Sequence, residues 1–360
     1  MGTRAAAAPA SQSRLVAILH RGAPLLFAIL LVSAIVLIAD AGPVVIQRRV
    51  TLGLIYLIAV VGLYVFVGNS GVLSFGNVSF MAIGAYVSAL LTMQRAAKAM
   101  FLPHLPALIG GAEWPPLAGA LAGACVAAVV AAVAGLPLVR LSGISGSIAT
   151  FALLVITNVG LGNWTSVTGG QQSLMGLPIY TDLWIAFGWA VFSLAVAFLY
   201  QESRSALALR ASREDEVAAR ASGVRIHRER LVAFTISGFL SGLAGVLFAH
   251  LLGALRVDSF YLDLTFLITA MLVIGGMASL TGAVIGTVTI TAVTEGLRQL
   301  EAGFQIPFLD LTIAAPAGLG DALLALAMLL ILLFRPDGLA QGREISWPVS
   351  GGRGSQPSVE

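Results

Sequence analysis

Residues Glu202–Arg230 read ESRSALALRASREDEVAARASGVRIHRER, the one long polar stretch in the middle of an apolar chain. It contains seven of the 20 Lys and Arg residues and five of the 17 Asp and Glu residues, and its flanks are nearly free of charge. A charge at the bilayer centre costs about 2.5–3.5 kcal/mol on insertion scales, so this stretch must lie in water between membrane spans. It is too short for a catalytic domain, and we interpret it as a docking surface.

The composition of the whole chain defines the fold class. Hydrophobic residues make up 58% of the 360 residues and charged residues only 10%, whereas a soluble domain is about a quarter charged. Spans rich in Leu, Ala, Val and Ile are helices and not barrel strands. We therefore predict an all-α polytopic membrane protein with about ten transmembrane helices of roughly 20 residues, within a range of eight to eleven. The single Cys125 excludes a disulfide framework and a cysteine-based metal site.

Basic residues predict the orientation of the chain. With ten spans and the N-terminus inside, fourteen of the 20 basic residues fall on the inner side, so both termini and the polar loop are expected to be cytoplasmic. Arg48 and Arg49 then lie outside, which leaves the first hairpin and the number of spans open. The predicted organisation is a cytoplasmic tail (1–22), a transmembrane domain (23–335) that includes a loop at 201–230, and a polar cytoplasmic tail (336–360).

Within the polar stretch, the residues predict a short helix. Ser212 suits the N-cap of a helix that runs to about Ser222, and Gly223 supplies its stop. Acids in the first turn complement the positive end of that helix, and these are Glu214, Asp215 and Glu216.

The same helix is expected to carry a face of small residues that a partner can approach closely, made of Val217, Ala218, Ala219 and Gly223. A solvated helix that only orients the protein remains the alternative from these residues alone.

Two glycine-rich segments interrupt the apolar pattern, GNSGVLSFGNVSFMAIGAYVSALL at Gly68–Leu91 and GGMASLTG at Gly275–Gly282. Broken backbone at membrane depth is tolerated only inside protein or beside water, so we predict broken helices near the midplane next to a translocation path. Close helix packing through glycine is the alternative. GGMASLTG lacks the Lys-Ser/Thr ending of a phosphate loop, which argues against nucleotide binding. The polar candidates for the path are Asn69, Ser70, Ser74, Asn77, Ser279 and Thr281.

Several stretches together resemble the LivM family, one of the two membrane subunits of bacterial branched-chain amino acid ABC importers. They follow the family order from about residue 50 to 340. The stretches are GNSGVLSFGNVSFMAIGAY (Gly68–Tyr86), LVRLSGISGSIATFAL (Leu138–Leu153), NWTSVTGG (Asn163–Gly170), ASREDEVAARASGVRIHRERLVAFTISGFLSGLAGVLFA (Ala211–Ala249), VIGGMASLTGAVIG (Val273–Gly286) and FRPDGL (Phe334–Leu339).

The block from Arg213 to Gly223 resembles the cytoplasmic loop through which ABC permeases engage their ATPases. Val217-Ala218-Ala219-x3-Gly223 stands where the family has EAA-x3-G, with Val217 in the usual Glu position and Ala206 where relatives have Gly. The resemblance implies a set of ATPase-coupling residues, namely Arg213, Glu214, Asp215, Glu216, Ala218, Ala219 and Gly223.

The resemblance also implies a function and partners. It implies a non-enzymatic permease subunit in the bacterial inner membrane that imports branched-chain or related small amino acids. The expected partners are a second, LivH-type permease, two cytoplasmic ATPase subunits and a periplasmic binding protein, with no nucleic acid. The chain has no Walker A motif, so we expect no cofactor of its own and ATP use only by the partners. Urea, short amides and other small organic acids are alternative cargoes.

Two other classes fit the residues less well. An ion- or proton-coupled secondary transporter normally places Asp, Glu or His inside its spans, and here only His250 lies near a span, at its end. A membrane enzyme requires clustered His, Asp or Glu, and the four histidines are scattered along the chain. We interpret His227 as a solvated neighbour of Arg225 and Arg228.

Overall fold

The computed structural model confirms an all-α polytopic membrane protein. It describes residues 10–106 and 110–301, and beyond them 304–305, 312–313, 325–326, 329, 333, 338–340 and 344. Within these residues, eight helices are long and apolar enough to cross a bilayer. The end of the predicted transmembrane domain, residues 302–335, lies outside the described residues, except for isolated positions.

Seven candidate spans lie in single helices: α1 (Ala10–Asp40), α2 (Val44–Ser70), α6 (Pro116–Leu138), α7 (Gly143–Asn163), α9 (Leu183–Gln201), α12 (Ile226–Leu252) and α14 (Leu280–Glu301). The eighth, Val257–Gly275, combines a short 3-10 helix with α13 (Leu262–Gly275). The shorter helices are α3 (Asn77–Thr92), α4 (Arg95–Phe101), α8 (Thr165–Thr168), α10 (Arg204–Glu214), α11 (Glu216–Ala221) and the 3-10 helix η1 (Val257–Phe260). Strands β1 (Leu174–Met175) and β2 (Ala254–Leu255) pair antiparallel, as do β3 (Phe304–Gln305) and β4 (Thr312–Ile313).

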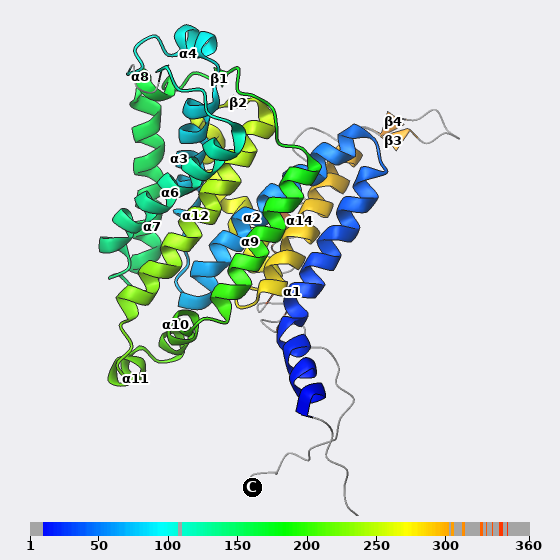
Figure 1. The fold of residues 1–360 in the computed structure, drawn as a ribbon, viewed down its shortest axis with the longest axis vertical. Coiled ribbons are helices and arrows are strands. Elements are labelled where there is room, and N and C mark those ends of the chain that lie inside the picture. The colour runs from blue at the N-terminus through cyan, green and yellow to red at the C-terminus, as the bar shows by residue number, and fades with distance from the viewer. Residues whose placement is uncertain are drawn as a thin grey trace, which may run out of the picture.

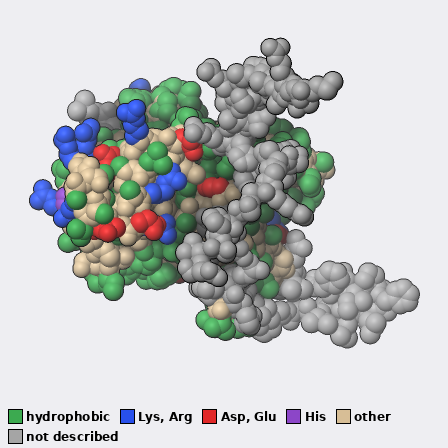
Figure 2. Space-filling model, turned by 90° about the horizontal axis from the view of Figure 1, so that it is seen from below, with side chains coloured by type: hydrophobic (Ala, Val, Ile, Leu, Met, Phe, Trp, Pro, Cys, Tyr) green, Lys and Arg blue, Asp and Glu red, His purple; other side chains and the backbone are tan. Residues whose placement is uncertain are grey.

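The two ends of the helical body differ in character. Helices α10 and α11 lie at one end, whereas α4, α8, β1 and β2 lie at the other (Figure 1). Seen from the α10–α11 end, charged side chains gather over one area with hydrophobic side chains around it (Figure 2). Large apolar side chains are exposed along the sides of α1, α6 and α7, as Leu30, Val129 and Ile156 illustrate. A charged end and apolar sides suit a body that stands across a bilayer.

Helix α12 forms the centre of the body and packs against α2, α3 and α6. A Cβ atom added to Gly238 would lie 2.3 Å from the Cβ of Ala131, and one added to Gly245 would lie 1.9 Å from the carbonyl oxygen of Met81. Lipid gives helices little hydrophobic reason to associate, so close contact through small residues provides the packing energy.

The first glycine-rich segment is a true interruption. Helix α2 ends at Ser70, Gly71 adopts a left-handed φ of 71°, and α3 begins only at Asn77. The side-chain amide of Asn77 donates to the carbonyl of Ala59 at 3.2 Å. Ala59 lies eleven residues before the end of α2, about 16 Å along the helix axis, so residues 71–76 return into the body and α3 begins partway along α2. The predicted broken helix is therefore present here.

The second glycine-rich segment differs from the prediction. Instead of a break near the midplane, Gly276–Ser279 forms the turn between α13 and α14, which pack against each other as a helical hairpin. A Cβ added to Gly275 would lie 2.0 Å from the carbonyl oxygen of Gly282. A Cβ added to Gly68, near the end of α2, would lie 2.7 Å from the carbonyl oxygen of Met277. The glycines therefore allow a tight reversal at the α10–α11 end of the body.

One of the two arginines that the predicted topology places on the outer side has an acidic partner in the structure. Arg49 of α2 forms an ion pair with Glu295 of α14, and both side chains are about one-third exposed. Helix α1 begins at Ala10, within the range predicted as the first tail, and it continues through Pro24.

We predict that Gly245→Ala lowers the stability of the protein by about 1–3 kcal/mol, because the new methyl group would collide with backbone that cannot move aside. The matched control is Gly188→Ala in α9, where an added Cβ meets no described atom within 4 Å. Thermal unfolding of the purified protein in detergent measures both. Equal melting temperatures for the two variants would contradict the close packing of α12 on α3.

Candidate functional site

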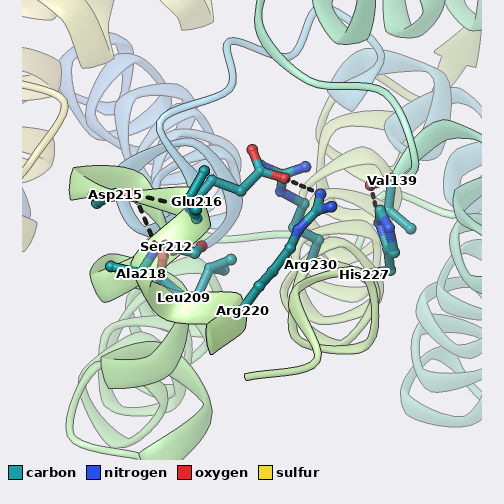
Figure 3. Close-up of polar contacts among 10 residues, drawn as sticks. Val139, Leu209, Ser212, Asp215, Glu216, Ala218, Arg220, His227 and Arg230 are labelled. Carbon is teal, nitrogen blue, oxygen red and sulfur yellow. Dashed lines mark hydrogen bonds and ion pairs between the residues drawn. The ribbon is translucent and has the colours of Figure 1, made fainter. Parts of the chain in front are cut away.

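Helices α10 and α11 are two short helices joined at Asp215. The side chain of Ser203 caps α10, and Asp215 caps α11 by accepting hydrogen bonds from the backbone of Val217 at 2.8 Å and Ala218 at 3.0 Å (Figure 3). The predicted helix from a Ser212 cap to Ser222 is therefore wrong. Ser212 is buried inside α10, and its hydroxyl donates to the carbonyl of Leu209.

The predicted face of small residues is divided between two sides of α11. Val217 is 79% exposed and Ala218 is exposed, whereas Ala219 is buried against the rest of the protein. Gly223 follows the helix with a left-handed φ of 85°, which confirms it as the stop. The surface open to a partner is therefore centred on Val217 and Ala218.

Glu216 ties α11 to the first turn of α12. Its carboxylate lies 2.5 Å from the guanidinium of Arg220 and 3.5 Å from that of Arg230 (Figure 3). Arg230 is buried, and its Nε and Nη1 atoms have no hydrogen-bond partner among the described residues. Burial alone would raise the pKa of Glu216, but the hydrogen bond from Arg220 and the charges of Arg230 and Arg220 outweigh it and lower that pKa.

Arg213 connects α10 to the interruption after α2. Its Nη1 donates to the carbonyl oxygen of Gly68 at 3.0 Å, one of the last carbonyls of α2 that a helix leaves without an internal partner. The stem of Arg213 also lies against Gly71, where an added Cβ would approach its Cγ to 2.9 Å. Arg213 and the neighbouring Glu214 are both exposed residues, but the guanidinium of Arg213 reaches back to the body.

The candidate path residues of the first interruption are buried, and most of their polar atoms are occupied. Asn77 joins α3 to α12, because its side-chain oxygen accepts from Ser237 at 3.1 Å and from Ser241 at 2.6 Å. The Ser70 hydroxyl accepts from the backbone of Val72, and Ser74 is buried. Asn69 donates to the carbonyl of Val65, but its side-chain oxygen is buried without a hydrogen-bond partner among the described residues.

The candidates of the second segment lie at the α10–α11 end. Ser279 accepts from the backbone of Gly282 at 2.9 Å, and the hydroxyl of Thr281 donates to the carboxylate of Glu344 at 2.7 Å. Since Met277 contacts Gly68, this turn lies beside Asn69, whereas Asn77 lies deeper along α2. The six candidates therefore fall at two levels of the body.

Sequence reasoning did not identify three connections at this end. His227 is exposed, as expected, but its Nδ1 also lies 3.2 Å from the carbonyl oxygen of Val139, which can only accept (Figure 3). The roles of Arg230 and Glu344 were also missed. The position of Arg230 as the last charged residue before the apolar run from Leu231 was the available signal, and no local pattern marked Glu344.

The buried His250 belongs to the opposite end of the body. Its Nε2 lies 3.0 Å from the hydroxyl of Ser88, its Nδ1 lies 2.9 Å from the carbonyl of Pro178, and its ring stacks on Tyr180 with centroids 4.3 Å apart. These contacts hold the segment before α9 against α3 and α12. Among the residues that the structure describes, no group of three His, Cys, Asp or Glu side chains is placed to hold a metal ion.

The fold is that of a multi-pass helical membrane protein with a small polar helix pair fixed to one end. Residues 45–333 match the family described as the permease component of branched-chain amino acid transport systems, and the chain belongs to this family. It is 29% identical to the high-affinity branched-chain amino acid permease protein LivM of Escherichia coli K12, over 85% of this chain and 73% of that protein.

Further relatives extend the comparison. The LivM protein of Salmonella typhimurium is 30% identical over 86% of this chain and 74% of its own length. The autoinducer 2 import permease LsrC of Photorhabdus luminescens is 22% identical over 51% of this chain and 52% of its own length. No solved structure matches the chain.

We predict that Glu216→Gln lowers the free energy of unfolding by about 1–3 kcal/mol, because it leaves the buried Arg230 without its carboxylate. The folded-state pKa of Glu216 is depressed, so this stabilisation is present above its ordinary pKa of 4.5 and is lost as the pH falls through the lower folded value. Chemical unfolding at neutral pH measures the effect. The exposed Glu214→Gln is the matched control, and an equal loss in both variants would contradict a specific role for Glu216.

Proposed function

We propose that this chain is the membrane-spanning subunit of an ATP-driven ABC importer that moves branched-chain or related small amino acids into the cell. The observation that carries the proposal is the geometry of the α10–α11 pair, which protrudes from the body and is tied to it at two points, one in each helix. Arg213 reaches the end of α2, and Glu216 reaches the start of α12. A force applied to the exposed Val217 and Ala218 surface is therefore passed to two long helices.

The proposed partners follow from the family and from that surface. Two cytoplasmic ATPase subunits supply the force, since the chain has no Walker A motif, and at least one of them docks on α11. A second, LivH-type permease completes the membrane pathway, and a periplasmic binding protein delivers the solute. The subunit itself needs no cofactor and catalyses no reaction.

The coupling residues divide into two roles under this proposal. Ala218 and the exposed acids Glu214 and Asp215 face the ATPase, whereas Arg213, Glu216 and the buried Ala219 connect the helix pair to the body. Gly223 allows the sharp turn that returns the chain to α12. Movement of α11 would then change the packing of α2 and α12, a bistable rearrangement of helices that switches access across the membrane.

For the translocation path we propose the six polar candidates at the glycine-rich segments, Asn69, Ser70, Ser74, Asn77, Ser279 and Thr281. Asn69 is the strongest of them because its side-chain oxygen is buried, has no hydrogen-bond partner within the described part of the chain, and can accept a hydrogen bond from an ammonium group. The others become available only when the helices rearrange, since Asn77 and Thr281 already have partners.

The proposed membrane is the bacterial inner membrane, with both termini and the α10–α11 end in the cytoplasm. In this arrangement 1–22 and 336–360 are tails and 23–335 is the transmembrane domain, with the coupling loop at 201–230. Related permeases named for autoinducer 2 import favour a second possibility within the same class, a different small polar cargo such as urea, a short amide or a small organic acid.

We predict that Ala218→Trp weakens ATPase association at least tenfold, because a large side chain at the centre of the exposed α11 surface prevents close approach. The permease is purified with its ATPases, and bound ATPase and leucine uptake into proteoliposomes are measured together.

The control for this experiment is Ala99→Trp, the same change at an exposed helical position at the opposite end. It should retain the ATPases. Normal association in Ala218→Trp, or leucine accumulation by the wild type in the absence of nucleotide, would contradict the proposed function.

A further inference from the structure

We propose that a short C-terminal segment fixes the α13–α14 turn to the end of α9 and so acts as a positioning element in coupling. The segment comprises the backbone of Gly338–Ala340 and the side chain of Glu344, and we call it the C-terminal brace. It lies beyond residues 45–333, which match the family, although it includes the end of the FRPDGL stretch, and it was expected to be part of a polar tail. The transport readout of this inference rests on the proposed function, whereas the contacts of the brace are independent of it.

The backbone of the brace closes the end of α13. The amide of Leu339 donates to the carbonyl of Ile274 at 2.8 Å, and that of Ala340 donates to the carbonyl of Gly275 at 3.0 Å. These are among the last carbonyls of α13, which have no partner within the helix. Gly338 has a left-handed φ of 77°, and a Cβ there would lie 2.6 Å from the nitrogen of Gly276. Only glycine allows this approach.

The carboxylate of Glu344 closes the start of α14. It accepts from the amide of Leu280 at 2.7 Å, from the amide of Thr281 at 3.3 Å and from the hydroxyl of Thr281 at 2.7 Å. A negative charge is favourable at the positive end of a helix, and hydrogen bonds to a carboxylate are stronger than neutral ones. One tail residue therefore satisfies donors that the α13–α14 turn leaves free.

The same carboxylate connects α14 to α9. The side-chain amide of Gln201 donates to Glu344 at 3.1 Å, and the side-chain oxygen of Gln201 accepts from the hydroxyl of Tyr64 in α2 at 3.0 Å. The backbone carbonyl of Gln201 accepts a hydrogen bond from Arg210 of α10. Gln201 is the last residue of α9, directly before the polar stretch, so Glu344 joins α14 to the point from which the coupling helices begin.

These contacts give the coupling helices α10 and α11 a second connection to the α13–α14 turn. The first runs from Arg213 to Gly68, which contacts Met277. The second runs from α9 through Gln201 and Glu344 to the start of α14. If the brace is released, α14 is no longer obliged to move with α9 and α10. ATP hydrolysis should then continue while fewer solutes are moved.

The test uses the full assembly with its ATPases in proteoliposomes and the variant Glu344→Gln. The glutamine side chain has one carbonyl oxygen in place of two carboxylate oxygens. It therefore cannot accept all the hydrogen bonds that Leu280 and Thr281 donate at the start of α14. We expect at least a threefold rise in ATP hydrolysed per leucine imported, and faster hydrogen exchange in the peptide 276–283. Glu344→Asp keeps the charge and should recover part of the coupling.

The matched control is Asp263→Asn, which removes an exposed acid from the first turn of α13 at the opposite end of the body. It should leave both readouts unchanged. Unchanged exchange in Glu344→Gln would overturn the brace. Faster exchange with an unchanged ATP-to-leucine ratio would overturn its role in coupling. If the wild-type assembly imports nothing with ATP, the proposed function fails, and faster exchange in Glu344→Gln alone would still support the brace.

Discussion

The hydrogen bond from Arg213 to the carbonyl of Gly68 joins the water-facing part of this protein to its apolar body. Helix ends leave backbone polar groups without partners, and hydrocarbon offers them none, so the protein must supply hydrogen-bond partners at these ends. The bond from Arg213 does this for α2. The carboxylate of Glu344 serves the start of α14 in the same way. A buried polar group without a partner costs about 1–3 kcal/mol, so each such side chain holds two segments in a defined relation.

Close packing of the helices allows these local hydrogen bonds to transmit movement to distant parts of the body. Helix α12 contacts α3 and α6 through glycines that leave no room for a methyl group, and the α13–α14 hairpin closes in the same manner. Packed elements of this kind cannot deform gradually, so a displacement at α11 is passed on as movement of whole helices. Glu216 and Arg230 connect α11 to α12, which touches the α3 helix that follows the first interruption.

Much of the architecture was predictable because it depends on local composition. Apolar runs located the spans from α1 to α14, and the charged run located α10 and α11. Glycine content was ambiguous, since it favours a broken helix and a tight turn alike: Gly71 lies in the broken helix and Gly275 at the tight turn.

The cap of α11 was misassigned because Ser212 and Asp215 both suit an N-cap, and the choice depended on burial of Ser212 in α10. The contacts of Asn77 with Ser241 and of Thr281 with Glu344 join distant parts of the chain, so no local pattern revealed them.

The central claim is that α10 and the α13–α14 turn move as one unit. Its most direct test is the distance between spin labels at Leu207→Cys in α10 and Met277→Cys in the turn, placed in a Cys125→Ser background because Cys125 is exposed. Both positions are exposed enough to carry a label. The distance is measured in the assembly with its ATPases, with and without bound nucleotide. The account predicts the same distance distribution in both states, and a shift of that distribution on nucleotide binding would contradict it.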